Sequence, residues 1–226
     1  MFLLLTVSCA QSPKVVPETT EATVVSTTPP FQTKEPERYR ATRTITTVTS
    51  AGETIVTENR IARDGELRRD ESEAAGQRVV YLDLREGKFV VLPNEALFAG
   101  WVNTDEARIK SDENSESSPD RLLHTEPVAT TYQRLGAETI NGRNTQKYRV
   151  VVNSSPGANV SVSVTMIWID DALQMPIRSE MESANGAYSA MILSDISLEV
   201  DPSLFRIPEG YEKITFTELR KRLKWD

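Results

Sequence analysis

The chain has 226 residues, 38% of them hydrophobic, with a formal net charge of −7 and a pI near 5.0. Contacts to phosphate need clustered lysine and arginine side chains, so this charge balance argues against a nucleic-acid-binding protein. One cysteine, Cys9, and one histidine, His124, provide no disulfide framework, no zinc ligand set and no Cys-His or Ser-His pair with supporting spacing. The length fits one large β domain plus a tail.

Residues 1–9 form an apolar run that ends at a cysteine and is much shorter than the ~20 residues that span a bilayer. This run resembles the end of a bacterial lipoprotein signal peptide, in which the cysteine carries the lipid. We therefore expect lipidation at Cys9; the alternative is a free buried cysteine on a core strand. Because Ala10 replaces the aspartate of the inner-membrane retention signal, the resemblance implies an outer-membrane location in a Gram-negative host.

Residues 10–37 are rich in threonine and proline and lack glycine. Such a segment has too little apolar content to fold by itself and too much proline to pair regularly in a sheet. We predict a disordered tether that holds residues 38–226, a single β domain, away from the membrane.

The first half of this domain has the pattern of a strand meander. Strands are predicted from Tyr39 to Ser50 and from Glu53 to Asp64, joined at a glycine-containing turn, and a second turn follows at Asp64-Gly65. Two further strands are predicted from Gln77 to Leu84 and from Lys88 to Leu92. Asn94 is a candidate cap for a short helix from Glu95 to Val102, which would cover the open sheet face.

A polar, acidic loop at residues 103–120 interrupts the strand pattern. It lacks the alternating acidic ligands and the glycine of a calcium-binding loop, so we expect a solvated loop and no metal site. Leu122 and Leu123 can add a helical turn. His124 has no local partner that would make it a general base.

The strand pattern then returns in a hairpin around Asn141-Gly142, the most specific short signal for this turn, with strands from Arg134 to Ile140 and from Arg143 to Val152. Next comes a strand with strict alternation, a polar turn at Asp170-Asp171, and a return strand that starts at Pro176. The strand from Tyr188 to Val200 carries a second apolar stripe. The side chains proposed to line an apolar groove are Val160, Val162, Val164, Met166, Trp168, Tyr188, Ala190 and Ile192.

The closing segment shows two helix-start patterns. Asp201 can cap a short turn that has Pro202 at its first position. Thr215 and Glu218 have the spacing of a capping box, which predicts a C-terminal helix with Phe216, Leu219 and Leu223 on one side.

The order LGAETINGRNTQKYRVVV, TMIWIDDALQMPIRSEM and DPSLFRIPEGYEKI resembles a bacterial envelope-protein family related to the outer-membrane lipoprotein carriers of the LolA and LolB type. The resemblance rests on turn and packing residues and so indicates a fold better than an activity. It implies a mainly β fold: a strongly curved antiparallel sheet, unclosed like a half-barrel, with two or three short helices on the concave side or at the ends.

Three functions remain open. The first is an anchored, non-enzymatic envelope lipoprotein, expected to be a monomer, whose concave sheet binds acyl chains or a lipidated protein in the periplasm. The second is a protein-interaction or envelope-stress sensor module. The third, a hydrolase, would need a clustered acid-base constellation, and the acidic pair Asp170-Asp171 is better explained as a turn. The sequence indicates no catalytic residue, metal or cofactor.

Overall fold

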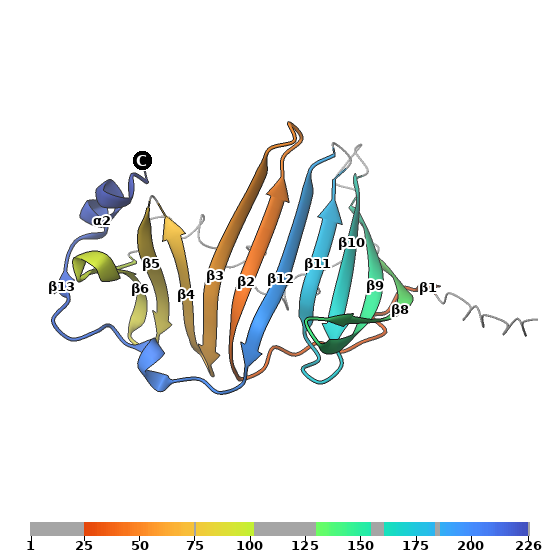
Figure 1. Cartoon of the computed structure of the whole chain (residues 1–226), viewed down its shortest axis with the longest axis horizontal. Helices are drawn as coiled ribbons and strands as arrows, with labels where there is room; N and C mark the ends of the chain where they lie inside the picture. The colour runs from red at the N-terminus through yellow and green to blue at the C-terminus, as the bar shows by residue number, and fades with distance from the viewer. Residues whose placement is uncertain (1–24, 75, 102–129, 155–160, 184–185, 226) are drawn as a thin grey trace, which may run out of the picture.

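The computed structural model describes residues 25–74, 76–101, 130–154, 161–183 and 186–225, which form one curved sheet of 13 strands (Figure 1). The spatial order is β1-β8-β9-β10-β11-β12-β2-β3-β4-β5-β6-β7-β13. The first seven strands in the chain are β1 (Val25–Ser26), β2 (Arg38–Val48), β3 (Thr54–Asp64), β4 (Leu67–Ala74), β5 (Gln77–Leu84), β6 (Gly87–Leu92) and β7 (Leu97–Gly100). The others are β8 (Thr130–Ile140), β9 (Arg143–Ser154), β10 (Ser161–Asp170), β11 (Pro176–Glu182), β12 (Tyr188–Ser197) and β13 (Glu212–Lys213).

Two antiparallel meanders make up the sheet, one from β2 to β7 and one from β8 to β12. They join where β12 pairs with β2, with Tyr188 opposite Val48 and Ile192 opposite Thr44. Among the strands that the structure describes, all pairs are antiparallel except that of β13 with β7. The predicted mainly β fold with an unclosed antiparallel sheet is therefore confirmed.

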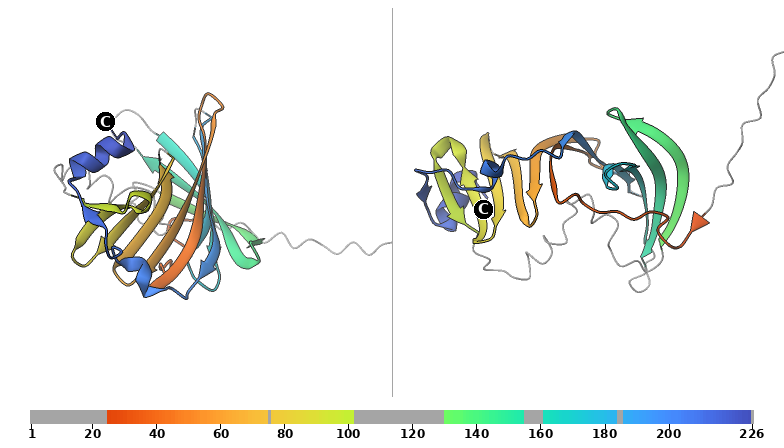
Figure 2. Two further views of the ribbon diagram at one scale, coloured as in Figure 1. Left: turned by 60° about the vertical axis from the view of Figure 1, so that its left-hand side comes forward. Right: turned by 90° about the horizontal axis from the view of Figure 1, so that it is seen from below.

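The sheet has an inner face and an outer face, which strand alternation distinguishes. The inner face is defined as the one carrying Tyr39, Ala41 and Ile61; the segment Phe31–Glu37 lies against it and runs inside the curve of the sheet (Figure 2). Residues opposite one another in adjacent strands share a face, so the register carries this assignment across the sheet. On β10 it places Ile167 on the inner face and Trp168 on the outer face.

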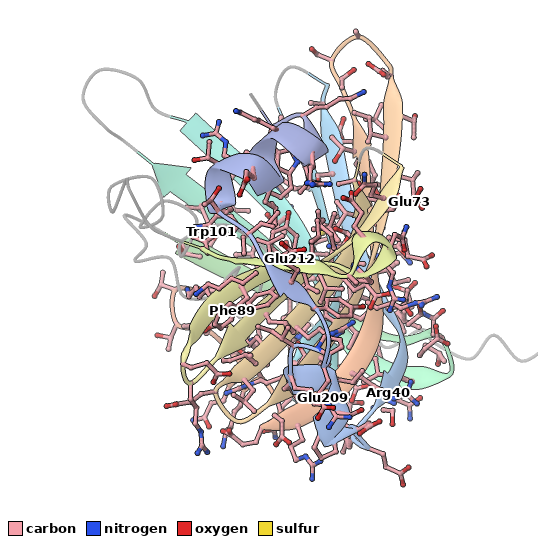
Figure 3. The ribbon with its side chains drawn as sticks, turned by 90° about the vertical axis from the view of Figure 1, so that its left-hand side faces the viewer. Arg40, Glu73, Phe89, Trp101, Glu209 and Glu212 are labelled. Atoms are coloured by element: carbon pink, nitrogen blue, oxygen red, sulfur yellow. The ribbon has the colours of Figure 1, made fainter. Side chains whose placement is uncertain are left out.

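The C-terminal segment covers both faces of the sheet at the β4–β7 end. A short 3-10 helix, η3 (Pro202–Phe205), is capped by Asp201 as predicted and buries Phe205 against Leu82 and Leu84 on the outer face. Helix α2 (Phe216–Leu223) buries Leu219 and Leu223 against Val79 and Val90 on the inner face. The ring of Phe216 in α2 lies 5.3 Å from the ring of Trp101, which is labelled beside α2 in Figure 3.

The predicted helix from Glu95 to Val102 is wrong. A 3-10 turn, η1 (Pro93–Glu95), ends at Ala96, whose φ of 54° breaks any helix, and the chain continues as β7. Leu97 and Ala99 point to the buried inner face, while Phe98 packs on the outer face under the C-terminal segment. Both faces of β7 are covered, so its sequence lacks the polar alternation that would distinguish a strand from a helix.

The predicted strand from Tyr188 to Val200 is shorter and less regular than expected. A bulge between Ser194 and Ser197, where Asp195 has a φ of 52°, breaks the alternation. Leu198, expected on the apolar stripe, is therefore 55% exposed beyond the end of the strand.

Several predictions concern residues outside the described ranges, namely Cys9, Val160, the acidic loop at residues 103–120, the turn at Leu122 and Leu123, and His124. Within the described ranges, none of the helices has the length and apolar character needed to cross a bilayer.

Candidate functional site

The apolar stripe of β10, made of Val162, Val164, Met166 and Trp168, lies on the outer face and changes from exposed to buried along the strand. Val162 is 54% exposed, Val164 and Met166 are half-buried, and Trp168 is 2% exposed. These four side chains share one face of β10, and the groove that they are expected to line stays a prediction. Tyr188, Ala190 and Ile192 of β12 share this face and are half-buried.

The two stripes are separated by β11, which contributes charged side chains between them. Arg178 stands between Trp168 and Ile192, and Glu180 stands between Met166 and Ala190. Arg178 and Glu180 form an ion pair. The outer face therefore alternates apolar and charged rows across the strands and does not present one continuous apolar surface.

Trp168 is held in a frame of polar groups. Its ring lies between the ammonium of Lys147, 4.5 Å from the ring centroid, and the guanidinium of Arg178, 4.7 Å from it. Its indole N–H donates to a carboxylate oxygen of Glu138 at 2.7 Å. That hydrogen bond and the charge of Lys147 lower the pKa of Glu138. This arrangement accounts for Trp168 as a packed, hydrogen-bonded core residue.

On the inner face, the segment Phe31–Glu37 forms a strap across the sheet. The ring of Phe31 lies 5.7 Å from that of Tyr132 and 4.7 Å from that of Tyr148. The amide of Lys34 donates to the carbonyl of Gln174 at 3.0 Å. The sequence pattern predicts that these residues belong to the tether. Local sequence gives no sign of the strap, because the aromatic partners of Phe31 lie about a hundred positions further along the chain.

Glu35 fixes the strap through buried charge. Its side chain is 6% exposed and accepts hydrogen bonds from Tyr39 at 2.7 Å, from Arg68 at 2.9 and 2.7 Å, and from Arg63 at 3.1 Å. Burial raises the pKa of Glu35, but the hydrogen bonds from Arg68 and Tyr39 and the charges of Arg68 and Arg63 outweigh it, so the pKa is lowered. Burial and the Glu35 charge raise the pKa of Tyr39.

A second polar group occupies the centre of the inner face. Asp70 accepts hydrogen bonds from Arg43 at 2.5 Å and from the amide of Asn59 at 2.7 Å. Tyr81 stands opposite Asp70 in the ladder, and burial together with the Asp70 charge raises its pKa to about 12. Strap and ion pairs together make the middle of the inner face polar.

The acidic pair at the β10–β11 turn has a structural explanation. Asp170 is 1% exposed, accepts the backbone N–H groups of Ala172 and Leu173 at 2.9 and 2.7 Å, and pairs with Arg143 at 2.5 Å. These contacts cap a turn, as the sequence indicates. Among the described residues, no group of three or more His, Cys, Asp or Glu side chains has a geometry that could hold a metal ion.

An exposed apolar site that the sequence did not single out lies on the β2–β3 hairpin. Ile55 and Val56 are 49% and 62% exposed on opposite faces of β3. The sequence feature that could have indicated this site is the length of the predicted strand from Glu53 to Asp64, since a strand longer than its neighbour leaves part of its edge unpaired.

Several solved structures are similar to this chain at low sequence identity. They include a LolA superfamily protein from Nitrosomonas europaea, at 11% identity over 75% of this chain and 90% of that chain with a TM-score of 0.34. A DUF1329 family protein from Desulfovibrio piger matches at 13% identity over 75% and 92%, with a TM-score of 0.30. MucB matches at 11% identity over 76% and 58%, with a TM-score of 0.44. No family model and no curated protein matches the sequence.

Proposed function

We propose that this chain is a non-enzymatic binding protein of the bacterial cell envelope, held at the membrane by a lipid on Cys9, whose curved sheet engages another protein. The observation that supports this most directly is the occupied inner face. The strap and the ion pairs of Glu35 and Asp70 fill the middle of the surface on which a half-barrel would hold an apolar ligand.

An acyl chain would gain little binding free energy on this inner face. It gains about 0.8 kcal/mol for each CH₂ removed from water against an apolar lining. Buried carboxylates and guanidinium groups lose solvation when hydrocarbon replaces water around them, and that loss opposes the gain. A protein partner can meet both the apolar and the charged rows of the sheet, because interfaces combine apolar cores with polar rims.

In-cell photo-crosslinking tests this proposal. A photo-crosslinking amino acid replaces Val162 or Ile55 in the full chain, and Thr217, exposed on α2, serves as the control position. We expect a discrete protein adduct from at least one of the two test positions and none from the control. Adducts to lipid alone at both test positions would contradict a protein-binding role.

The exposed start of the β10 stripe favours a second candidate, an apolar ligand on the outer face. Val162 is 54% exposed beside the half-buried Val164. Displacement of a fluorescent fatty-acid probe tests it, using Val162→Asp and the matched control Ser163→Asp on the opposite face. The acyl candidate requires probe binding that only Val162→Asp abolishes, whereas a protein-binding module shows no saturable probe binding.

A further inference from the structure

The sheet splits between β3 and β4 (Figure 1). β3 pairs with β2 along its whole length, from Thr54 opposite Val48 to Asp64 opposite Arg38. Its pairing with β4 covers only the stretch from Arg60 to Asp64. In the part of the chain that the structure describes, no strand pairs with the remaining edge of β3, from Thr54 to Asn59.

Hairpin geometry indicates which backbone groups face this open edge. The amide of Thr49 donates to the carbonyl of Glu53 at 2.8 Å, which makes these two residues a hydrogen-bonded pair. Bonded and non-bonded pairs alternate along an antiparallel ladder. The backbone N–H and C=O groups of Ile55 therefore form hydrogen bonds with β2. Those of Thr54, Val56 and Glu58 point away from β2, toward the split.

The side chains of this edge suit a strand-pairing surface. Four successive residues, Thr54–Thr57, are β-branched, and Ile55 and Val56 stand exposed on its two faces. A long edge with free backbone groups and exposed apolar side chains is a template for another strand. Proteins usually protect such edges with lysine, proline or a bulge, and the Thr54–Asn59 edge has none of these.

Acidic side chains outnumber basic ones around the split, and the basic ones, Arg60 and Arg78, both pair with Glu71. Glu53 and Glu58 flank the exposed pair on the hairpin, and Glu73 stands on β4 across the split (labelled in Figure 3). No ion pair involves any of these three carboxylates within the described residues. Charge complementarity therefore favours a cationic partner.

We propose that the Thr54–Asn59 edge of β3 docks an extended polypeptide segment of alternating apolar and basic residues, which adds to the sheet as a strand. The inference rests on the proposed protein-binding function and names its surface and the class of partner. Main-chain hydrogen bonds to the outward groups of Thr54, Val56 and Glu58 supply affinity. Contacts with Ile55 and Val56 and attraction to Glu58 supply selectivity.

Fluorescence polarisation tests the edge with the purified full chain and a labelled peptide of alternating lysine and valine, about six residues long to match the edge. Val56→Pro removes one outward N–H group and leaves the bonds to β2 in place, because proline fits an edge position whose N–H faces solvent. Val56→Thr keeps the N–H group and the β-branched shape. We expect saturable binding by the wild type and by Val56→Thr, and binding at least about fivefold weaker in Val56→Pro, the effect of one lost backbone hydrogen bond.

A charge-reversal variant gives a readout that does not depend on tolerance of proline. Glu58→Lys should weaken binding of the lysine-valine peptide and strengthen binding of a glutamate-valine peptide of the same length. A merely structural disturbance would weaken both. Absence of saturable wild-type binding overturns the proposal, as does equal binding by the wild type, Val56→Pro and Glu58→Lys.

Sedimentation of the full chain tests the alternative occupant of the edge, which is a second copy of this chain. A concentration-dependent dimer that Val56→Pro abolishes would assign the edge to self-pairing and overturn the peptide site. If peptide binding fails while photo-crosslinking at Val162 still captures a protein, the proposed function stands and only the assignment of the edge falls.

Discussion

At the scale of single residues, the stability of the fold depends on charge buried under the strap. We expect Glu35→Gln to lower the free energy of unfolding at pH 7 by about 3 kcal/mol, because Arg63 and Arg68 lose their shared carboxylate. The folded pKa of Glu35 lies below its unfolded value, so its contribution is complete above the unfolded pKa of about 4.3 and is lost as pH falls through the folded pKa. The difference in unfolding free energy between wild type and variant, measured with urea, should therefore shrink as the pH falls below about 4.3.

Glu37 provides the matched control for Glu35. It lies two residues away and also pairs with Arg63, at 3.6 Å, but its side chain is 63% exposed. Glu37→Gln should change the unfolding free energy by less than about 1 kcal/mol. Equal effects of the two substitutions, or a Glu35→Gln deficit that does not shrink as the pH falls below about 4.3, would contradict a strap fixed by buried charge.

Trp168 supplies the largest packing contribution expected from one side chain. Trp168→Ala should cost about 3 to 5 kcal/mol, because it leaves a cavity under Lys147 and Arg178. Trp168→Phe keeps a ring and removes the N–H donor; since Glu138 is 44% exposed and can be solvated, this change should cost about 1 kcal/mol beyond the change in volume. Chemical denaturation followed by circular dichroism measures both, and a cost under 1 kcal/mol for Trp168→Ala would contradict its burial.

At the scale of secondary-structure elements, α2 closes the inner face and depends on its first turn. Thr215 accepts the amide of Glu218 at 3.2 Å, and the Glu218 carboxylate accepts the amide of Thr215 at 2.9 Å, which completes the predicted capping box. Thr215→Ala should therefore lower stability by about 1 kcal/mol. Thr217→Ala, two residues on and exposed, should stay within about 0.5 kcal/mol of the wild type in thermal unfolding. Equal effects of both would rule out the cap as a source of stability.

Local signals account for the elements that the sequence predicted well. The hairpin at Asn141-Gly142 forms with φ of 49° and 75°, which suits these two residue types, and the strand Gln77–Leu84 forms with the predicted bounds. β7 escaped prediction because both of its faces are buried, and the bulge at Asp195 because nothing local marks it. The strap escaped because Glu35 is stabilised by Arg63 and Arg68, about thirty residues further along the chain.

The candidate site was predictable in composition and not in arrangement. Alternation placed Val162, Val164, Met166 and Trp168 on one face, as the structure has them. The position of β11 between the two stripes depends on the order of the strands in the sheet. The residue pattern within a single strand does not determine that order. The open edge of β3 depends on the length of β4 relative to β3, which is likewise a property of the pair.

At the scale of the whole molecule, the proposed anchor sets where the sheet works. If Cys9 carries a lipid, the full chain made in a bacterial host will partition into the detergent phase, and Cys9→Ser will move it to the aqueous phase. The difference arises because acyl chains contribute about 0.8 kcal/mol for each buried CH₂. Equal partitioning of the two proteins would contradict a lipid anchor at Cys9.

We propose that the curved sheet binds a protein and not a free acyl chain. Native mass spectrometry of the gently purified Cys9→Ser chain tests it most directly, because without the anchor any lipid that remains is a ligand of the sheet. We expect the mass of the polypeptide alone and that of its complex with a protein partner. A stoichiometric, non-covalently bound acyl lipid on the polypeptide would contradict it.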